Sequence, residues 1–219
     1  ARPTQQRETK VLFEAGNYNL VHSSVAHNAP INEDLAVRLA VDYTYREGYL
    51  EGGGDSRQDA AARLSLLYKP NSAFSIYLWG YGVSRNGHPG GFVTKGFDPA
   101  TGQLSQNKFL NKDPWNDVLT GDLAAFAPFG SPKGEDQHYK NYMVGGELNI
   151  ELGGGVSLTY IPSYFYVDWY QDYWISGLPS FISARYNQYT QEVRLSGENG
   201  RLKWLAGIYA YRVVNSGDI

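Results

Sequence analysis

Few residues in this sequence are spaced for catalysis or metal binding. The four histidines lie far apart, and no pair has the i, i+4 or H-x-E spacing of a metal site. No G-x-S-x-G nucleophile motif is present, and the glycine runs at 52–54 and 153–155 lack the Lys-Ser/Thr of a phosphate-binding loop. The acidic stretch at 111–117 does not have EF-hand spacing. We therefore expect no catalytic residue, no metal and no cofactor, and no enzyme; a barrel hydrolase is the catalytic alternative.

Aromatic and basic side chains near the ends of predicted strands are better placed to bind a ligand. Aromatic rings can stack on a flat or sugar-like molecule, and an arginine can pair with an anionic group. The alternative is that such rings only lie at the headgroup level of a membrane, as we expect for Tyr43, Tyr45, Tyr164 and Tyr166. The candidate ligand-binding residues are Trp79, Tyr81, Arg85, His88, Trp115, Tyr173 and Trp174.

Residues 35–46 are the clearest structural element in the sequence. Their odd positions read Leu, Val, Leu, Val, Tyr, Tyr, and their even positions read Ala, Arg, Ala, Asp, Thr, Arg. This period of two predicts a strand with one apolar and one polar face, whereas a helix would mix the charges with the leucines. At about 3.3 Å per residue and a tilt of about 40°, the strand rises about 30 Å, slightly more than the roughly 25 Å apolar band of an outer membrane.

The same alternation recurs along the chain and predicts about nine strands in all. Short turns alternate with long connections, an asymmetry typical of outer-membrane barrels, which have short periplasmic turns and long extracellular loops. The predicted fold class is therefore all-β, an antiparallel transmembrane β-barrel segment. The long connections are predicted near residues 47–58, 85–137 and 170–186.

Charged residues recur on the polar faces of these strands. They are Arg38, Asp42, Arg46, Arg63, Glu147, Glu151, Glu192 and Arg194. On an inward-facing surface such charges would hold a partner inside the barrel through ion pairs and hydrogen bonds. The alternative is a solvated face without a specific partner.

Composition excludes several classes of protein. A formal net charge of −3 argues against a nucleic-acid binder, and the absence of cysteine excludes disulfides and thiolate metal sites. No run of 18 apolar residues is present, so no transmembrane helix is expected. The aromatic content of 15% and the 25 glycines are typical of a β protein rich in turns.

Several short stretches resemble the TonB-dependent outer-membrane receptors of Gram-negative bacteria. The A-R-P-T at 1–4 resembles the end of the plug domain that closes such barrels. Four stretches resemble the first barrel hairpins of the family, in family order: G-N-Y at 16–18, N-A-P-I at 28–31, L-A-V-R at 35–38 with G-Y at 48–49, and L-L-Y-K-P at 66–70. Two more resemble a later hairpin of the same barrels: Q-E-V-R-L-S at 191–196 and W-L-A-G-I-Y at 204–209.

The resemblance implies a segment of a larger receptor. Residues 1–7 would be the tail of the plug or its linker, and residues 8–219 would be a partial barrel, about nine strands of a probable 22. Its implied partners are outer-membrane lipid, the plug and remaining strands of the parent chain, an inner-membrane energy-coupling complex and a small-molecule nutrient, with no nucleic acid. The implied function is energy-coupled uptake of a siderophore, cobalamin or glycan across the outer membrane of a Gram-negative bacterium.

Two other interpretations remain open from the residues alone. One is a small, self-contained outer-membrane barrel that acts as a passive pore or a structural protein. The other is a soluble, aromatic-rich β-sandwich that binds carbohydrate.

Overall fold

The computed structural model describes residues 1–89, 95–97, 104–109, 136–175 and 178–216, and this part of the chain is built from strands. The side chains of residues 95–97, 104–109, 173–175 and 178–180 are outside the description. In chain order the strands are β1 (Glu8–Gly16), β2 (Leu20–Pro30), β3 (Leu35–Arg46), β4 (Arg57–Tyr68), β5 (Phe74–Gly87), β6 (Lys95–Phe97), β7 (Leu104–Phe109), β8 (Gln137–Gly153), β9 (Val156–Ile175), β10 (Leu178–Asn199) and β11 (Leu202–Ser216). No helix in the described part is long and apolar enough to cross a membrane.

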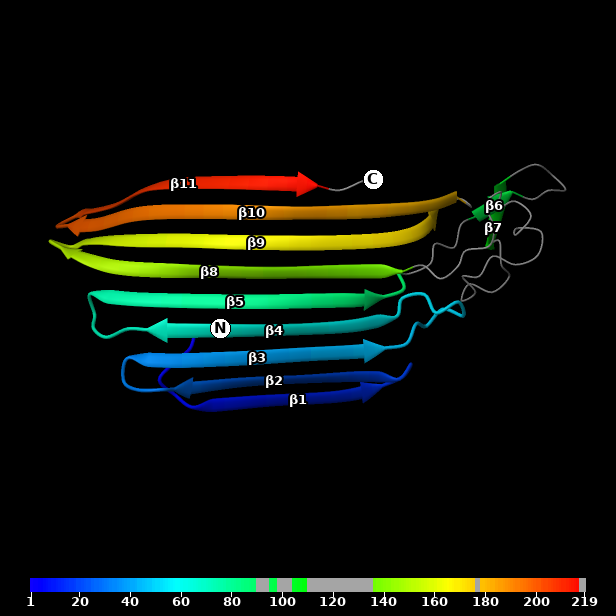
Figure 1. Cartoon of the computed structure of the whole chain (residues 1–219), viewed down its shortest axis with the longest axis horizontal. Helices are drawn as coiled ribbons and strands as arrows, with labels where there is room; N and C mark the ends of the chain where they lie inside the picture. Colours follow the sequence, from blue (N-terminus) through cyan, green and yellow to red (C-terminus); the bar gives the residue numbers. More distant parts are fainter. Residues whose placement is uncertain (90–94, 98–103, 110–135, 176–177, 217–219) are drawn as a thin grey trace.

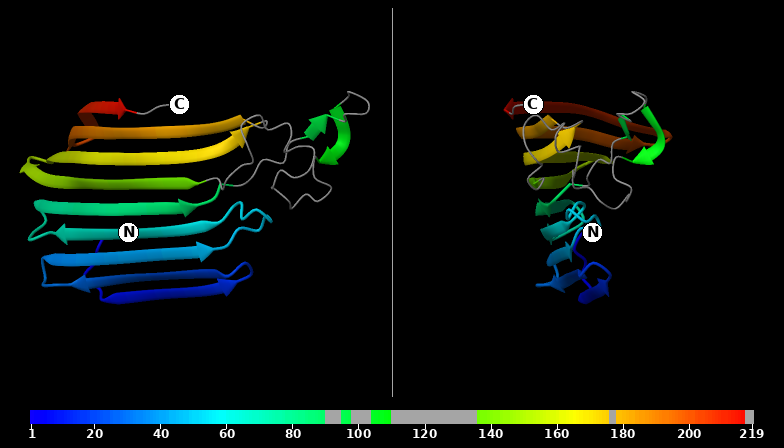
Figure 2. Two further views of the ribbon diagram at one scale, coloured as in Figure 1. Left: turned by 45° about the vertical axis from the view of Figure 1, so that its right-hand side comes forward. Right: turned by 90° about the vertical axis from the view of Figure 1, so that its right-hand side faces the viewer.

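Nine of these strands form one sheet in the order β1-β2-β3-β4-β5-β8-β9-β10-β11 (Figure 1). All neighbouring strands of this sheet are antiparallel. Each strand pairs with the strand before it and the strand after it in the sequence, except that β5 pairs with β8, because β6 and β7 are not part of this sheet. The sheet is a single layer whose outermost strands, β1 and β11, lie at opposite sides (Figures 1 and 2). Strands β6 and β7 pair only with each other within the described residues.

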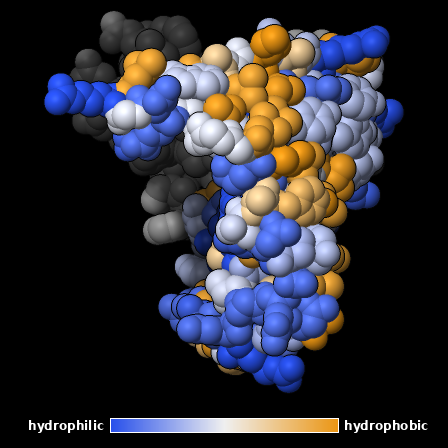
Figure 3. Space-filling view, turned by 90° about the vertical axis from the view of Figure 1, so that its left-hand side faces the viewer, coloured by the Kyte–Doolittle hydropathy of each residue, from blue (hydrophilic) through white to orange (hydrophobic). Residues whose placement is uncertain are grey.

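The period of two gives the sheet two chemically different faces. Val37 lies opposite Leu66, and Leu66 lies opposite Leu78, so apolar side chains line up across β3, β4 and β5. The residues between them in sequence, such as Arg38 and Ser65, share the opposite face. We call these the apolar face and the polar face. Seen along the strands from the end with the short turns, hydrophobic residues gather along one side of the sheet (Figure 3).

The turns differ in length at the two ends of the sheet. At one end, the connections at 31–34, 69–73, 154–155 and 200–201 are short. Gly153, Gly154 and Gly155 all have positive φ angles, which residues with a side chain rarely adopt. The other end holds the turn at 17–19, the loop at 47–56 and the long connection between β5 and β8. We call the two ends the short-turn end and the loop end.

One of the three predicted long connections, at 170–186, is wrong. The predicted loop at 47–58 is a loop from 47 to 56, and β5 and β8 bound the predicted loop at 85–137 at Gly87 and Gln137. The predicted loop at 170–186 is instead strand, because β9 continues to Ile175 and β10 begins at Leu178. These two strands stay paired up to the partners Ile175 and Leu178.

The amino-terminal residues 1–7 form an arm, which lies against the polar face. In Figure 2 the N-terminus lies to one side of the sheet rather than within it. On this face Ala36, Asn28, Ser65 and Tyr77 are all buried, with exposed fractions of 0 to 6%, and Asn28 and Tyr77 contact the arm. Elsewhere the sheet leaves large hydrophobic side chains open, for example Val144 at 53% and Ile208 at 76%. Much of the tightest packing therefore lies between the arm and the polar face.

Candidate functional site

The structure brings all eight predicted inward charges onto the polar face. The register places Arg38, Asp42 and Arg46 of β3 on the same face as Arg63 of β4. Through β5, β8 and β9, the same face continues to the remaining four, which are Glu147, Glu151, Glu192 and Arg194. Because side chains on a strand point alternately to its two faces, the parity of these positions was sufficient to group them.

Ion pairs connect the first three strands on this face. His22 of β2 contacts Glu14 of β1 at 2.6 Å through Nδ1 and Asp42 of β3 at 3.0 Å through Nε2. A neutral imidazole has one N–H, so donating to both carboxylates requires a proton on each ring nitrogen. Arg38 lies 3.9 Å from Glu8, again across β2. These contacts hold the polar face of the first three strands together.

A cluster of aromatic and charged side chains lies where β4, β5 and β8 meet. The rings of Tyr77 and Trp79 stack with their centroids 5.0 Å apart, and Arg63 donates to the hydroxyl of Tyr77 at 3.2 Å. Trp79 lies over Gly145, because a Cβ at that position would come within 2.6 Å of the indole. The missing side chain of Gly145 thus makes room for the Trp79 ring.

Arg2 of the arm binds in this cluster. Its guanidinium pairs with the carboxylate of Glu147 and lies over the ring of Tyr77, 4.7 Å from the centroid. Asn149 donates to Glu147 at 2.9 Å, and Thr159 of β9 donates to Asn149 at 2.8 Å. The carboxylate that receives Arg2 is therefore oriented by a chain of hydrogen bonds across two strands.

Asn28 binds the middle of the arm. Its side chain is 1% exposed and accepts from the Thr4 backbone N–H at 3.0 Å. Its amide group donates to the Thr4 carbonyl at 2.8 Å, to the Thr4 hydroxyl at 3.2 Å and to the Gln6 carbonyl at 2.5 Å. A buried amide satisfied on both its oxygen and its nitrogen fixes the path of the backbone that it binds.

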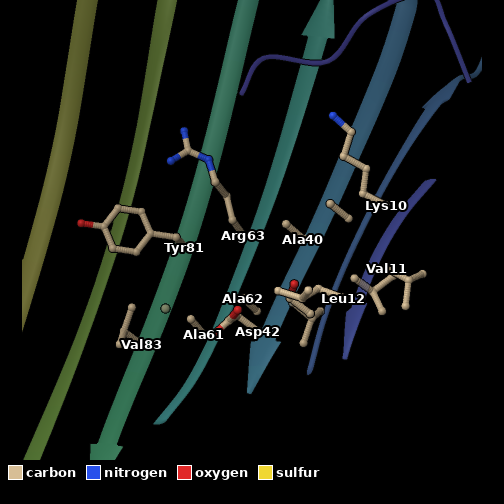
Figure 4. A pocket seen from close by; sticks show the side chains of 15 residues that line it. Lys10, Val11, Leu12, Ala40, Asp42, Ala61, Ala62, Arg63, Tyr81 and Val83 are labelled. Carbon is tan, nitrogen blue, oxygen red and sulfur yellow. The ribbon is translucent and has the colours of Figure 1, made fainter. Parts of the chain in front are cut away.

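Next to this cluster the polar face has a hollow of about 590 Å³ (Figure 4). Its floor includes small residues of β2, β3 and β4, namely Ser24, Ala26, Ala40 and Ala61. Lys10, Asp42, Arg63 and Tyr81 also line it, and Figure 4 shows the Arg63 and Tyr81 side chains on adjacent strands. Sequence reasoning named three of these four but missed the hollow, although small residues at polar-face positions of β2, β3 and β4 were its visible signal.

A second hollow, of about 500 Å³, lies at the loop end of β3, β4 and β5. Arg46 binds both the backbone carbonyl and the carboxylate of Asp55, and its guanidinium lies 5.0 Å from the centroid of the Tyr49 ring. The hydrogen bond between the Tyr49 hydroxyl and the Asp55 carboxylate is the largest cause that raises the pKa of Tyr49. The negative charge of Asp55 raises this pKa further. These contacts tie the loop at 47–56 to the end of β3.

The predicted ligand-binding residues are only partly brought together. Trp79, Tyr81 and Arg85 share the polar face of β5, and Arg85 lies 3.8 Å from Asp59. Trp79 was predicted near the end of its strand, but β5 continues beyond it to Gly87. His88 lines the hollow at the loop end and lies 3.5 Å from Asp136. Trp115 lies outside the described residues, as do the side chains of Tyr173 and Trp174, whose backbone is part of β9.

The predicted interfacial tyrosines lie on the apolar face. Tyr43 and Tyr45 are near the loop end of β3. Tyr164 and Tyr166 of β9 belong to a larger group of rings, since Tyr142 stacks on Tyr166 at 4.6 Å and Tyr189 lies 5.0 Å from Tyr164. The cross-strand pairs Lys140 with Asp168 and Asp168 with Arg185 follow toward the loop end.

Within the described residues, no group of three His, Asp or Glu side chains could hold a metal ion. The site is therefore a surface of paired charges, aromatic rings and two hollows. Through noncovalent contacts, this surface can bind an arm, a domain or a solute on the polar face.

No protein-family model matches the sequence, and no curated protein matches it. Solved structures are similar in fold. The open form of the ferric-catecholate import receptor Fiu from E. coli K12 matches 99% of this chain with a TM-score of 0.77 and 12% identity. The closed form of Fiu matches 99% with a TM-score of 0.65, and the FpvAI–pyocin S2 complex matches 98% with a TM-score of 0.69, both at 12% identity.

The chain spans only about a third of these proteins, covering 36%, 32% and 28% of their respective lengths. At this level of identity the similarity concerns the fold. Nearly the whole chain therefore has the fold of part of an import-receptor structure, an all-β arrangement of nine antiparallel strands in one sheet.

Proposed function

We propose that this chain forms part of the barrel wall of a TonB-dependent outer-membrane receptor, which takes up a scarce nutrient. The observation that carries the proposal is the two-faced sheet of nine antiparallel strands, whose fold matches the receptor structures over 98 to 99% of the chain. The charged arm contacts on one face and the open hydrophobic face on the other are what a wall between lumen and lipid requires.

The apolar face would contact lipid. It carries open hydrophobic side chains such as Leu64, Val144 and Ile208, which in water would form an unusually large exposed apolar surface. The tyrosines around Tyr166 would lie at the headgroup level of the outer leaflet, with Lys140 and Arg185 just outside it. This order of apolar, aromatic and charged residues favours an outer-membrane location.

The edges of the sheet support the proposal that this is a segment of a larger barrel. β1 and β11 each have one neighbour within the described part of the chain. Unpaired backbone groups are costly in lipid, so a membrane sheet must close on itself. Further strands of the parent chain would complete the barrel, about 22 in all.

The polar face would line the lumen and contact a plug domain. Its eight charges and its hollow of about 590 Å³ offer ion pairs, hydrogen bonds and space to such a partner. An inner-membrane complex would power the displacement of the plug, so that the nutrient passes without covalent chemistry. The nutrient would be a small molecule of the siderophore, cobalamin or glycan class, captured at the loop end.

An uptake assay tests the proposal. The intact protein is produced in a Gram-negative host that lacks its own receptors, and the uptake of labelled ferric catecholate, cobalamin and maltodextrin is measured with and without an uncoupler. We expect uptake of one of these classes at nanomolar concentration and its loss when the inner membrane is uncoupled.

Other results would contradict it. Uptake of several small solutes that is insensitive to the uncoupler would indicate a passive pore. A protein that stays folded and monodisperse in water without detergent would indicate the soluble carbohydrate-binding alternative.

A further inference from the structure

The site that holds Arg2 is built more completely than a surface ion pair. Tyr77, which supplies the ring under the guanidinium, is 6% exposed, and the side chain of Glu147 is 19% exposed. The Tyr77 ring is fixed from two sides, by the stacked Trp79 and by the hydrogen bond from Arg63. Asn149 and Thr159 also orient Glu147, so contacts outside the arm hold both Tyr77 and Glu147.

The geometry points to a guanidinium-selective site on the polar face, formed by Tyr77 and Glu147, from which Arg2 can be released while Asn28 keeps the rest of the arm in place. A planar guanidinium can stack on an aromatic face and bind a carboxylate at the same time. A lysine ammonium is a point charge that is more strongly hydrated and lacks the planar fork. The shape of the site therefore distinguishes the two cations.

The attachments of the arm at Arg2 and at Asn28 differ in strength. The side chain of Arg2 is 53% exposed, so its ion pair is screened by water and salt. Asn28 is 1% exposed and makes four hydrogen bonds to Thr4 and Gln6, which salt does not screen. A pull on the amino-terminal end, or competition by another guanidinium, would therefore free residues 1–3 first.

The release would have a limited reach. Three extended residues span about 10 Å, so the amino-terminal end at Ala1 could move by about that distance before the hydrogen bonds of Asn28 to Thr4 and Gln6 come under tension. All the contacts that hold the arm lie within the described residues. The Arg2 site could therefore prove unselective in a protein that takes up a nutrient, and it could prove selective in a protein that takes up none.

Spin labels on the arm test the inference in the intact protein, held in lipid nanodiscs. These 219 residues contain no cysteine. In a background without any cysteine elsewhere in the intact protein, Ala1→Cys and Gln6→Cys each place one nitroxide, before the Arg2 site and beside the Asn28 anchor. Guanidinium chloride is added at concentrations far below those that unfold proteins and is compared with sodium chloride at equal ionic strength. We expect guanidinium to mobilise the label at position 1 more strongly than sodium does, and to leave the label at position 6 immobile.

Substitutions identify the site. Glu147→Gln and Arg2→Lys should each raise the mobile fraction at position 1 by about three- to tenfold, and Glu147→Gln should remove the response to guanidinium. Glu151→Gln is the matched control, because Glu151 lies on the same face of the same strand, four residues beyond Glu147, and has no contact with the arm. The control should behave like the unsubstituted protein.

Three outcomes would overturn the inference. Equal release by sodium and guanidinium would show an unselective ion pair, and an effect of Glu151→Gln equal to that of Glu147→Gln would show a general charge effect. Simultaneous release at positions 1 and 6 would show that the arm has one attachment rather than two. If Glu147→Gln does not fold, the guanidinium titration of the unsubstituted protein still decides between these outcomes.

Discussion

Asn28 shows how one buried polar side chain can order a whole segment. Its oxygen and nitrogen atoms bind backbone groups of the arm that strand pairing does not satisfy. Two other pairs are comparable. The position of the Trp79 ring depends on the missing side chain of Gly145, and the pKa of Tyr49 depends on Asp55. Each of these dependences can be tested by a single substitution.

Asn28→Ala should destabilise the protein by about 1–3 kcal/mol, because the Thr4 and Gln6 backbone groups lose the buried amide that binds them. The free energy of unfolding can be measured by urea titration in nanodiscs, followed by circular dichroism. Gln58→Ala, at an exposed position of β4, should change it by less than about 0.5 kcal/mol. Equal effects of the two substitutions would show that the arm is not held through Asn28.

Gly145→Ala should destabilise the protein by about 1–3 kcal/mol, because the new methyl group would overlap the Trp79 ring. Gly82→Ala is the control, since its Cβ would have no atom nearer than 3.8 Å. The near-ultraviolet circular dichroism of tryptophan should change only in the first variant. An unchanged spectrum in Gly145→Ala would mean that Trp79 does not lie over this glycine.

Tyr49 should titrate above its ordinary pKa of 10.0, because its hydroxyl bonds to the Asp55 carboxylate and ionisation would place two negative charges together. The stabilising contact is complete below pH 10 and is lost as the pH rises through the higher pKa of the folded state. The absorbance difference between the parent protein and Tyr49→Phe during an alkaline titration isolates this group. Asp55→Asn should move its midpoint back down, and an unmoved midpoint would contradict the contact.

At the scale of the strand, the sequence predicts an element well where its two faces meet different surroundings. Residues 35–46 alternate because one face is apolar and the other charged, and the strand has the predicted bounds. The end of β9 does not alternate, since Tyr170, Tyr173 and Trp174 fall on both parities, and the stretch was mistaken for a loop. The alternation of apolar and polar residues alone cannot predict a strand that carries the same kinds of side chain on both faces.

The same reasoning explains which parts of the site were predictable. The parity of the eight charges follows from local spacing, so their common face could be predicted. The contact of Arg2 with Glu147 joins residues 145 apart, and no local pattern encodes it. The hollow beside Arg63 depends on five strands packing side by side, β1 to β5, which only the register reveals.

Hydrogen exchange tests the corrected hairpin of β9 and β10. Backbone amides at 170–175 and 181–186 take part in strand pairing, so we expect them to exchange as slowly as those of 156–166. Mass spectrometry of peptides from the intact protein measures this directly. Exchange within seconds at these positions would restore the loop that the sequence suggested.

For the whole molecule, the main feature is the contrast between the two faces of one layer. A globular domain hides its apolar side chains between layers, but here the apolar face is uncovered within the described chain. The polar face is the one that the arm covers. The sheet therefore requires different surroundings on its two faces, apolar on one and polar on the other.

Leu64→Arg should prevent or weaken insertion into a bilayer, because it places a charge on the apolar face at a cost of about 2–4 kcal/mol near the midplane. Ala61→Arg adds the same side chain to the same strand, on the polar face, where the hollow of about 590 Å³ has room for it, and should be tolerated. Heat-modifiable migration in gels reports the folded fraction of each variant in liposomes. Equal folded fractions would argue against lipid on the apolar face.

The chain order of the sheet also has a kinetic consequence. Because every strand joins its predecessor, the sheet has low contact order, and pairing can zip from one hairpin to the next. The exception is the junction of β5 and β8, where closure must bridge residues 88–136 rather than a loop such as 47–56. That closure costs about 1.4 kcal/mol more entropy, so we expect β1–β5 and β8–β11 to assemble as two blocks that join last along this seam.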